Sequence, residues 1–243
     1  MPSIQVVVLA AGMGTRLGRP LPKPLAQLDD GRTIMAQQLD NVREVFGNDA
    51  RVVIVVGYKH DRIMEEVPDD ALFAYNQYYS ETNTSKSLLK ALQKSVDGPV
   101  IWMNGDVVFD PEVLRRLEPF LADDRSAIAV NTAATADEEV KYTVDERGAV
   151  RELSKKVQNA LGESVGINLI AGKDKAALIT RLDECDEQDY FERGIELAIA
   201  QDGLEVTPVD ISDLFAVEVD FAEDLERAIE ARQEYARTHP TQP

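Results

Sequence analysis

A glycine-rich segment with two basic side chains is the part of this chain best suited to chemistry. From Val7 to Leu28 it runs VVLAAGMGTRLGRPLPKPLAQL, and its spaced glycines are Gly12, Gly14 and Gly18. Glycine permits positive φ and lets phosphate oxygens approach backbone N–H groups without a Cβ in the way. Arg16 adds a planar cation, and Lys23 adds a point charge on a backbone that its flanking prolines should keep stiff and extended. The pattern predicts a polyphosphate site.

Two better-known phosphate-binding patterns do not fit this segment. The glycines follow GxGxxxG and not GxGxxG. The second predicted strand ends in Gly57-Tyr58-Lys59, where a dinucleotide-binding fold usually places an acidic residue. A Walker A loop needs Gly-Lys followed by Ser or Thr, which this sequence lacks. A nicotinamide site is therefore weakly supported, and a P-loop is excluded.

Strands and helices that alternate along the chain must position this segment. Short apolar runs predict strands, and helical periodicity predicts helices. The expected strands are 4–10, 51–56, 71–75, 100–103, 127–130, 164–170, 205–208 and 215–219. The expected helices are 33–46, 61–66, 85–95, 111–121, 173–182, 190–201 and 221–237. This order indicates an α/β fold with a Rossmann-like, mixed and mostly parallel sheet flanked by helices.

A predicted β-hairpin interrupts the alternation between residues 140 and 153. Its two short strands flank Asp145-Glu146-Arg147-Gly148, a turn with glycine at its last position. We expect this small excursion to lie over the acceptor side of the sheet. The expected organisation is one domain over 1–243, with a nucleotide-binding half 1–130, an acceptor-binding half 131–220 and a C-terminal helix and tail 221–243.

The composition narrows the class of partner. Lys and Arg total 26 against 44 Asp and Glu, a net charge of −18, which argues against nucleic acid or an anionic membrane surface. Without a membrane-spanning apolar stretch or a signal-peptide pattern, we expect a cytoplasmic protein. Cys185 is the only cysteine, and His60 and His239 are the only histidines. An internal disulfide is excluded, and thiol or histidine catalysis is not expected.

Two aspartates that follow predicted strands are candidates for holding a metal. Asp106 follows the strand 100–103 through a short turn, and Asp220 ends the strand 215–219 with Glu218 on the same face. Carboxylates at separate strand ends can hold Mg²⁺ and leave coordination positions for triphosphate oxygens. The alternative is that Asp106 is a turn residue and that Asp220 starts a capping box with Glu223.

Two further acidic positions are interpreted as helix starts. Asp189-Tyr190-Phe191-Glu192 satisfies the spacing of a capping box, and Asp110-Pro111 places proline at a first helical position. These acids are therefore expected to be structural.

The segment LAAGMGTRLGRPLPKPL, together with Gly105-Asp106 and Glu218-Val219-Asp220, resembles the signature of sugar-phosphate and choline-phosphate nucleotidyltransferases. The segments 76–88, 152–156 and 162–166 resemble the phosphocholine cytidylyltransferase-like branch of that superfamily. The Lys-Pro pair of the sugar-nucleotide branch is replaced here by Lys155-Lys156-Val157. This departure puts sugar binding in doubt.

The resemblance implies a role for individual residues of this chain. The backbone of Leu9, Ala10, Ala11 and Gly12 would receive the base and ribose beside the Gly14 turn, and Thr82, Asn83 and Ser87 would complete the base pocket. Arg16 and Lys23 would bind the triphosphate, Asp106 and Asp220 would hold Mg²⁺, and Lys156 or Lys155 would approach the acceptor phosphate.

The reaction implied is attack by a phosphate or phosphonate oxygen on the α-phosphorus of a nucleoside triphosphate, with CTP favoured. The nucleophile is already ionised, so no general base is required. An ammonium headgroup could lie against Tyr190 and Glu218, with Trp102 and Phe191, although the last two are equally well explained as core residues.

Two other functions stay open from the sequence. One is a sugar-1-phosphate nucleotidyltransferase that uses UTP, GTP or dTTP, and the other is a non-catalytic nucleotide-binding regulatory module. The acceptor is not identified, and a homodimer is one option for the oligomeric state.

Overall fold

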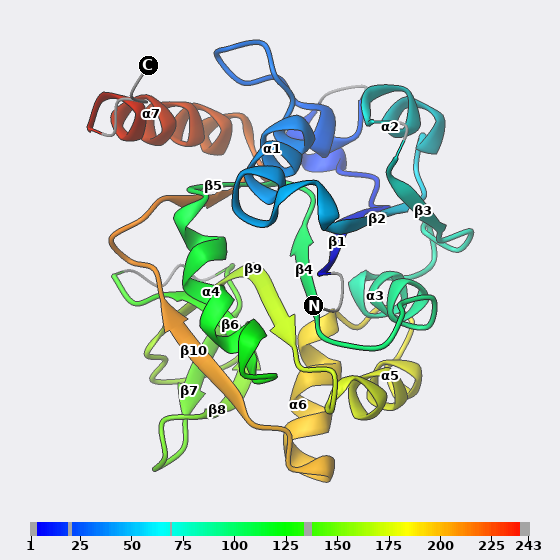
Figure 1. The fold of residues 1–243 in the computed structure, drawn as a ribbon, viewed down its shortest axis with the longest axis vertical. Coiled ribbons are helices and arrows are strands. Elements are labelled where there is room, and N and C mark those ends of the chain that lie inside the picture. Colours follow the sequence, from blue (N-terminus) through cyan, green and yellow to red (C-terminus); the bar gives the residue numbers. More distant parts are fainter. Residues whose placement is uncertain (1–3, 19–20, 69, 134–137, 239–243) are drawn as a thin grey trace.

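A central sheet of nine strands runs through the part of the chain that the computed structural model describes, residues 4–18, 21–68, 70–133 and 138–238 (Figure 1). Its path, in spatial order, is β10 (Val206–Asp210), β6 (Ser126–Asn131), β9 (Gly162–Ile170), β4 (Val100–Asn104), β1 (Gln5–Ala10), β2 (Arg51–Val56) and β3 (Leu72–Tyr75). β9 runs antiparallel to both of its neighbours, whereas β4, β1, β2 and β3 pair in parallel. The expected Rossmann-like, mixed sheet is confirmed.

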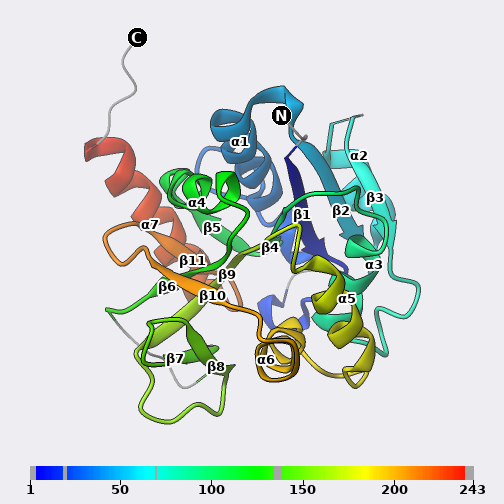
Figure 2. The same ribbon diagram turned by 60° about the horizontal axis from the view of Figure 1, so that its bottom comes forward.

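Helices cover both faces of this sheet (Figures 1 and 2). One face carries α3 (Thr84–Leu92), α5 (Lys175–Glu184) and α6 (Phe191–Asp202), and the other carries α1 (Ile34–Phe46), α2 (His60–Glu66) and α4 (Glu112–Ala122). Because side chains alternate along a strand, Val7 packs toward the first set and Val8 toward the second. In the described residues, no helix has the length and apolar character needed to cross a membrane.

Two of the helix starts illustrate what the sequence could and could not predict. Asp110 Oδ1 accepts a hydrogen bond from the Glu112 N–H at 2.8 Å, so its structural role before α4 is confirmed. The capping box expected at Asp189 and Glu192 is wrong. α6 begins after Tyr190 without a side-chain cap, and Asp189 accepts instead from the Asp186 N–H at 2.9 Å. Glu192 is left free of a capping role.

The expected hairpin is confirmed as β7 (Lys141–Val144) and β8 (Val150–Ser154). Asp145 closes its turn, because Oδ1 accepts from the backbone N–H groups of Arg147 and Ala149 at 2.9 and 3.0 Å. β7 also pairs antiparallel with the start of β9. The hairpin therefore projects from the start of β9 and is part of the same sheet rather than a separate unit (Figure 2).

A short strand that the sequence did not predict, β5 (Val107–Phe109), pairs antiparallel with β11 (Ala216–Glu218). Three residues directly after a longer apolar run give no separate periodic signal. This small ribbon places the segment that follows β4 beside the segment that precedes the last helix, α7 (Ala222–Thr238). It is the element that joins the two candidate metal-binding aspartates.

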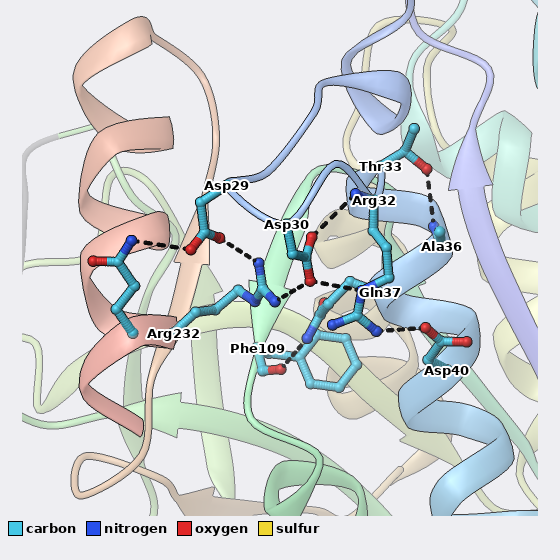
Figure 3. A network of polar contacts seen from close by, with 10 residues as sticks. Asp29, Asp30, Arg32, Thr33, Ala36, Gln37, Asp40, Phe109 and Arg232 are labelled. Carbon is cyan, nitrogen blue, oxygen red and sulfur yellow. Dashed lines mark hydrogen bonds and ion pairs between the residues drawn. The ribbon is translucent and has the colours of Figure 1, made fainter. Parts of the chain in front are cut away.

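The last helix is tied to the segment that follows Lys23 by a network of ion pairs (Figure 3). Arg232 donates to Asp29 at 2.8 Å and to Asp30 at 2.6 Å, and Arg32 Nε donates to Asp30 at 2.8 Å. Beneath this network a small apolar cluster includes Leu17 and Val219. Since these two residues adjoin Arg16 and Asp220 in the chain, α7 fixes the two segments against each other.

Candidate functional site

Lys23 is presented by a short 3-10 helix, Lys23–Leu25, that starts directly after an extended Pro22. The Leu25 N–H bonds to the Pro22 carbonyl and the Ala26 N–H to the Lys23 carbonyl, each at 2.9 Å. The extended backbone expected at Lys23 is therefore wrong, because these two turn hydrogen bonds outweigh the preference imposed by the following proline. The backbone is nevertheless fixed, as the flanking prolines indicated.

Gly14 makes room for the lysine. Its φ is +56°, and a Cβ placed there would lie 2.6 Å from Lys23 Cγ, closer than any side chain can approach. Gly18 also has positive φ, at +66°, but a Cβ there would meet no atom of the described residues within 4 Å. Gly12, in contrast, does not use the positive φ that a glycine permits. Gly14 is thus needed for a close contact, and Gly18 only for the path of the backbone.

The β5–β11 ribbon brings the two distant aspartates together. Glu218 pairs with Val107, and the Val219 N–H donates to the Asp106 carbonyl at 2.9 Å. The turn before Asp106 is held against β1, because the Gly105 N–H donates to the Leu9 carbonyl at 2.9 Å. Asp106 and Asp220 therefore lie at the carboxyl end of β4, next to the end of β1.

Lys23 contacts both aspartates. Its Nζ lies 3.0 Å from Asp106 Oδ2 and also donates to Asp220 Oδ1. Arg16 Nη1 lies 3.0 Å from the other oxygen of Asp220. The structure therefore joins the glycine-rich segment and the two strand-end aspartates in one polar cluster.

The capping interpretation of Asp220 and Glu223 is wrong. The carboxylate that accepts the N–H groups at this helix start belongs to Asp224, whose Oδ2 lies 3.0 Å from the Asp220 N and 2.8 Å from the Phe221 N. The Asp220 side chain is thereby left to face Lys23 and Arg16.

Three carboxyl groups in this cluster could hold a metal ion together. One oxygen from each of Asp106, Glu218 and Asp220 lies within 4.8 Å of the others. Oxygen-only donors of this kind suit hard divalent cations such as Mg²⁺. Glu218, which the sequence suggested for the acceptor, belongs by position to the metal cluster as well.

The electrostatics of the cluster follow from burial and from the opposite charges. Burial alone would lower the pKa of Lys23, but Asp106 and Asp220 outweigh it and hold that pKa above its ordinary value. Burial raises the pKa of Asp106 despite Lys23. Burial and the Asp106 charge raise the pKa of Glu218 well above its usual range. The site thus concentrates carboxyl groups that an additional cation would stabilise in their charged form.

A cavity of about 290 Å³ opens beside this cluster, between the ends of β1 and β4 and the start of α6. Of the predicted nucleotide-binding residues, five border it: Leu9, Ala10, Gly12, Gly14 and Asn83. So do eight others proposed from the sequence: Arg16, Lys23, Asp106, Lys155, Tyr190, Phe191, Glu218 and Asp220. The cavity therefore unites most residues that the sequence singled out.

Four predicted site residues do not border the cavity: Ala11, Thr82, Ser87 and Lys156. Thr82 and Ser87 accept hydrogen bonds from the Asn76 Nδ2 at 3.0 and 3.1 Å. Asn83 itself caps α3, since its Oδ1 accepts from the Thr84 N–H at 2.9 Å. In this structure Asn83 borders the cavity, whereas Thr82 and Ser87 hydrogen-bond to Asn76 and do not border it.

Of the two adjacent lysines, Lys155 borders the cavity, with its Nζ 5.2 Å from the centre of the Tyr190 ring. Trp102 does not border it and is 1% exposed, with its ring packed edge-on against Phe191 at 5.6 Å. Trp102 is therefore a core residue, as the second of the two sequence interpretations held.

Sequence reasoning missed several residues of the cavity wall: Asn104, Glu139, Ser164, Gly166 and Glu192. Ser164 and Gly166 lie two apart on β9, so strand alternation could have placed both on one face once the pairing of β9 with β4 was known. The sequence reasoning missed Glu192 as a cavity residue because its spacing from Asp189 had suggested a capping box.

The family described as "MobA-like NTP transferase domain" matches residues 6–181. This chain belongs to that family. The match covers most of the sheet and the glycine-rich segment, so the nucleotidyltransferase class suggested by the sequence resemblance is confirmed.

Individual relatives fall in the same class. "CMP-5'-(3-aminopropyl)phosphonate synthase" from Streptomyces rubellomurinus is 30% identical over 93% of this chain and 38% of its own length. "Bifunctional protein GlmU" from Pseudomonas aeruginosa is 26% identical over 97% of this chain and 52% of its own length. The chain thus spans about two fifths to one half of these curated relatives.

Solved structures share the fold. The inositol-1-phosphate CTP transferase from T. maritima matches with a TM-score of 0.76 and 16% identity, over 96% of this chain and 97% of that one. The CTP:phosphocholine cytidylyltransferase from Streptococcus pneumoniae matches with a TM-score of 0.69 and 18% identity, over 94% and 98%.

Proposed function

We propose that this chain is a Mg²⁺-dependent cytidylyltransferase that joins CTP to a small phosphate or phosphonate acceptor and releases pyrophosphate. The observation that carries the proposal is the contact of Lys23 with both Asp106 and Asp220 in the wall of one cavity. The cluster combines a fixed cation for phosphate with a carboxylate set for a hard metal ion. Nucleotidyl transfer needs both.

The chemistry assigned to the site is one displacement at phosphorus. An anionic oxygen of the acceptor attacks the α-phosphorus of CTP, and the bond from that phosphorus to the bridging oxygen of pyrophosphate breaks. Lys23 and Arg16 bind the triphosphate and neutralise the charge that the departing pyrophosphate gains. Asp106, Glu218 and Asp220 are the residues that would hold Mg²⁺, which neutralises phosphate charge when bound.

The acceptor oxygen is ionised at neutral pH, so the reaction needs alignment and charge neutralisation more than a general base. This requirement agrees with the side chains around the cavity, which include neither histidine nor cysteine among the described residues.

The preference for CTP rests on similarity. The sequence segment 76–88 resembles that of the phosphocholine cytidylyltransferase branch, and the Streptomyces relative is named for a CMP-linked product. The second candidate function is transfer to a sugar 1-phosphate with UTP, GTP or dTTP, which the similarity to GlmU over 97% of this chain favours. The Lys155-Lys156-Val157 sequence weighs against it.

A matrix of nucleotides and acceptors tests the proposal. CTP, UTP, GTP, dTTP and ATP are each combined with aminoalkyl phosphonates, phosphocholine, inositol 1-phosphate and sugar 1-phosphates, and pyrophosphate release is measured with Mg²⁺ present. We expect release with CTP and a non-sugar acceptor. Release only with another nucleotide and a sugar 1-phosphate would replace the proposal by the second candidate, and CTP binding without release would indicate a regulatory module.

A further inference from the structure

The start of α6 places a buried carboxyl group in the wall of the cavity. Glu192 borders the cavity and is 6% exposed, and its Oε2 has no hydrogen-bond partner among the described residues. Buried polar atoms in proteins almost always have a partner, and leaving one without costs free energy. A carboxyl group with an unpartnered oxygen in the wall of a ligand cavity is therefore available to a group of the ligand.

Nothing in the local structure requires a glutamate here. The helix starts without a side-chain cap, so Glu192 does not complete the capping box that its spacing suggested. Its neighbour Phe191 fills the core against Trp102, which fixes the first turn of α6 and holds the following residue at the cavity. The carboxyl group is thus positioned by packing and left free of structural hydrogen bonds at Oε2.

The groups around Glu192 favour a cation. Tyr190, 42% exposed, offers an aromatic ring at the same cavity, and Lys155 Nζ already lies 5.2 Å from the centre of that ring. Glu139 adds a second carboxyl group to the wall. An aromatic face together with carboxyl groups is a usual way to bind an ammonium ion.

The protonation of Glu192 is consistent with such a ligand. Burial raises its pKa to about 7, against the opposing effects of its own backbone N–H and of Lys155. A bound cation would stabilise the charged carboxylate, whereas an uncharged ligand would leave the burial cost without compensation.

We propose that Glu192 binds the ammonium group of an acceptor that carries a primary amine. The proposal rests on the nucleotidyltransferase function above and names the class of acceptor. A primary ammonium can donate an N–H to the free oxygen of Glu192, whereas a trimethylammonium group has no N–H to donate. A primary amine is therefore preferred over its quaternary counterpart.

The test compares acceptors that differ only at the terminal group. Phosphoethanolamine is set against phosphocholine, and 2-aminoethylphosphonate against 2-hydroxyethylphosphonate, with CTP and Mg²⁺ and with pyrophosphate release as the readout. We expect kcat/KM to favour the primary amine in each pair by about 10- to 100-fold, the size of one hydrogen bond to a charged group. Glu192→Gln should remove most of this preference and raise the acceptor KM, with the KM for CTP unchanged.

Two further variants test whether the amine preference depends on Glu192 and on the ring of Tyr190. Glu196→Gln is the matched control, because Glu196 lies one turn along the same helix, outside the cavity wall, and accepts from the Leu153 N–H at 3.1 Å. It should leave the preference intact. Tyr190→Leu changes an exposed side chain with little risk to folding, and should weaken binding of both amines more than binding of the hydroxyl acceptor.

The outcomes separate the two proposals. Absence of pyrophosphate release with every nucleotide and acceptor overturns the proposed function and this inference with it. Release from CTP with phosphocholine, a hydroxyl acceptor or a polyol phosphate as good as the amines overturns the inference alone. An unchanged amine preference in Glu192→Gln, in a variant that melts like the wild type, also overturns it.

Discussion

Lys23 Nζ donates a hydrogen bond to Asp106 Oδ2 at 3.0 Å, across 83 residues of sequence. The same ammonium contacts Asp220, which lies 197 residues from the lysine. One cation therefore links the glycine-rich segment to two carboxylates that are distant from it in the chain.

Lys23→Ala should lower the rate of pyrophosphate release by about 10²- to 10³-fold, because a fixed charge that stabilises the transition state is lost. The effect is measured by steady-state kinetics with CTP and an acceptor that the wild-type enzyme uses as a substrate. Lys90→Ala is the matched control, since Lys90 contacts Gln77 and Tyr78 outside the cavity. Near-normal release by the Lys23 variant would refute the role assigned to this lysine.

Gly14→Ala should impair turnover more than Gly18→Ala. Both substitutions place a Cβ at positive φ, but only the one at Gly14 would meet Lys23, at 2.6 Å from Cγ. Both variants therefore lose about 1 kcal/mol of stability to the strained backbone. Only Gly14→Ala also displaces Lys23. Thermal unfolding and kcat are measured for both. Equal loss of kcat in the two variants would show that the contact with Lys23 is unimportant.

Asp220→Asn should raise the Mg²⁺ concentration needed for half-maximal activity by about tenfold or more, because it removes a carboxylate from the metal cluster. Activity is titrated with Mg²⁺ after treatment with EDTA, which should abolish turnover until the metal is restored. Glu223→Gln removes a nearby exposed charge and should leave the titration unchanged. A metal requirement that is the same in all three proteins would contradict the assignment.

Arg232→Ala should destabilise the protein by about 1 kcal/mol at neutral pH, after allowance for the partial exposure of its partners. Burial alone would raise the pKa of Asp30, but Arg232 and Arg32 outweigh it and hold the pKa at about 2, below the ordinary 3.8. A lowered folded-state pKa stabilises the fold above pH 4, and this stabilisation is lost as the pH falls toward 2.

The difference in unfolding free energy between Arg232→Ala and wild type should therefore be present at pH 7 and shrink between pH 4 and pH 2. Denaturant unfolding at several pH values measures it. Arg237→Ala, in an exposed pair on the same helix, should have little effect. A difference that stays constant down to pH 2 would mean that the ion pairs with Asp29 and Asp30 are not its source (Figure 3).

Local patterns in the sequence predicted most of the elements. The strand Arg51–Val56 is found with the expected bounds, and α1 begins where Thr33 Oγ1 accepts from the Ala36 N–H at 3.1 Å. Such signals act within a few residues, through apolar periodicity and caps, and they need no knowledge of distant partners. The glycine-rich segment belongs to the same class, because its residue types alone indicate phosphate chemistry.

Long-range pairing decided what the sequence left open. Glu223 has the spacing of a capping residue, but Asp224 accepts the N–H groups at the start of α7. Glu192 has the same spacing, but the first N–H of its helix, at Phe191, donates to Thr84 Oγ1 at 3.1 Å, and Glu192 lies in the cavity wall. A spacing rule cannot distinguish among carboxylates that compete for the same N–H groups, because the choice depends on packing around the helix start.

The sequence by itself determined the α/β order of elements, and it predicted a phosphate site around Lys23 and two candidate aspartates at strand ends. Only the tertiary structure decided that these residues meet. The three-residue strand Val107–Phe109 is too short to give a sequence signal, yet its pairing with Ala216–Glu218 brings Asp106 next to Asp220. The hydrogen bonds between these two strands join residues more than a hundred positions apart, so no local pattern could specify them.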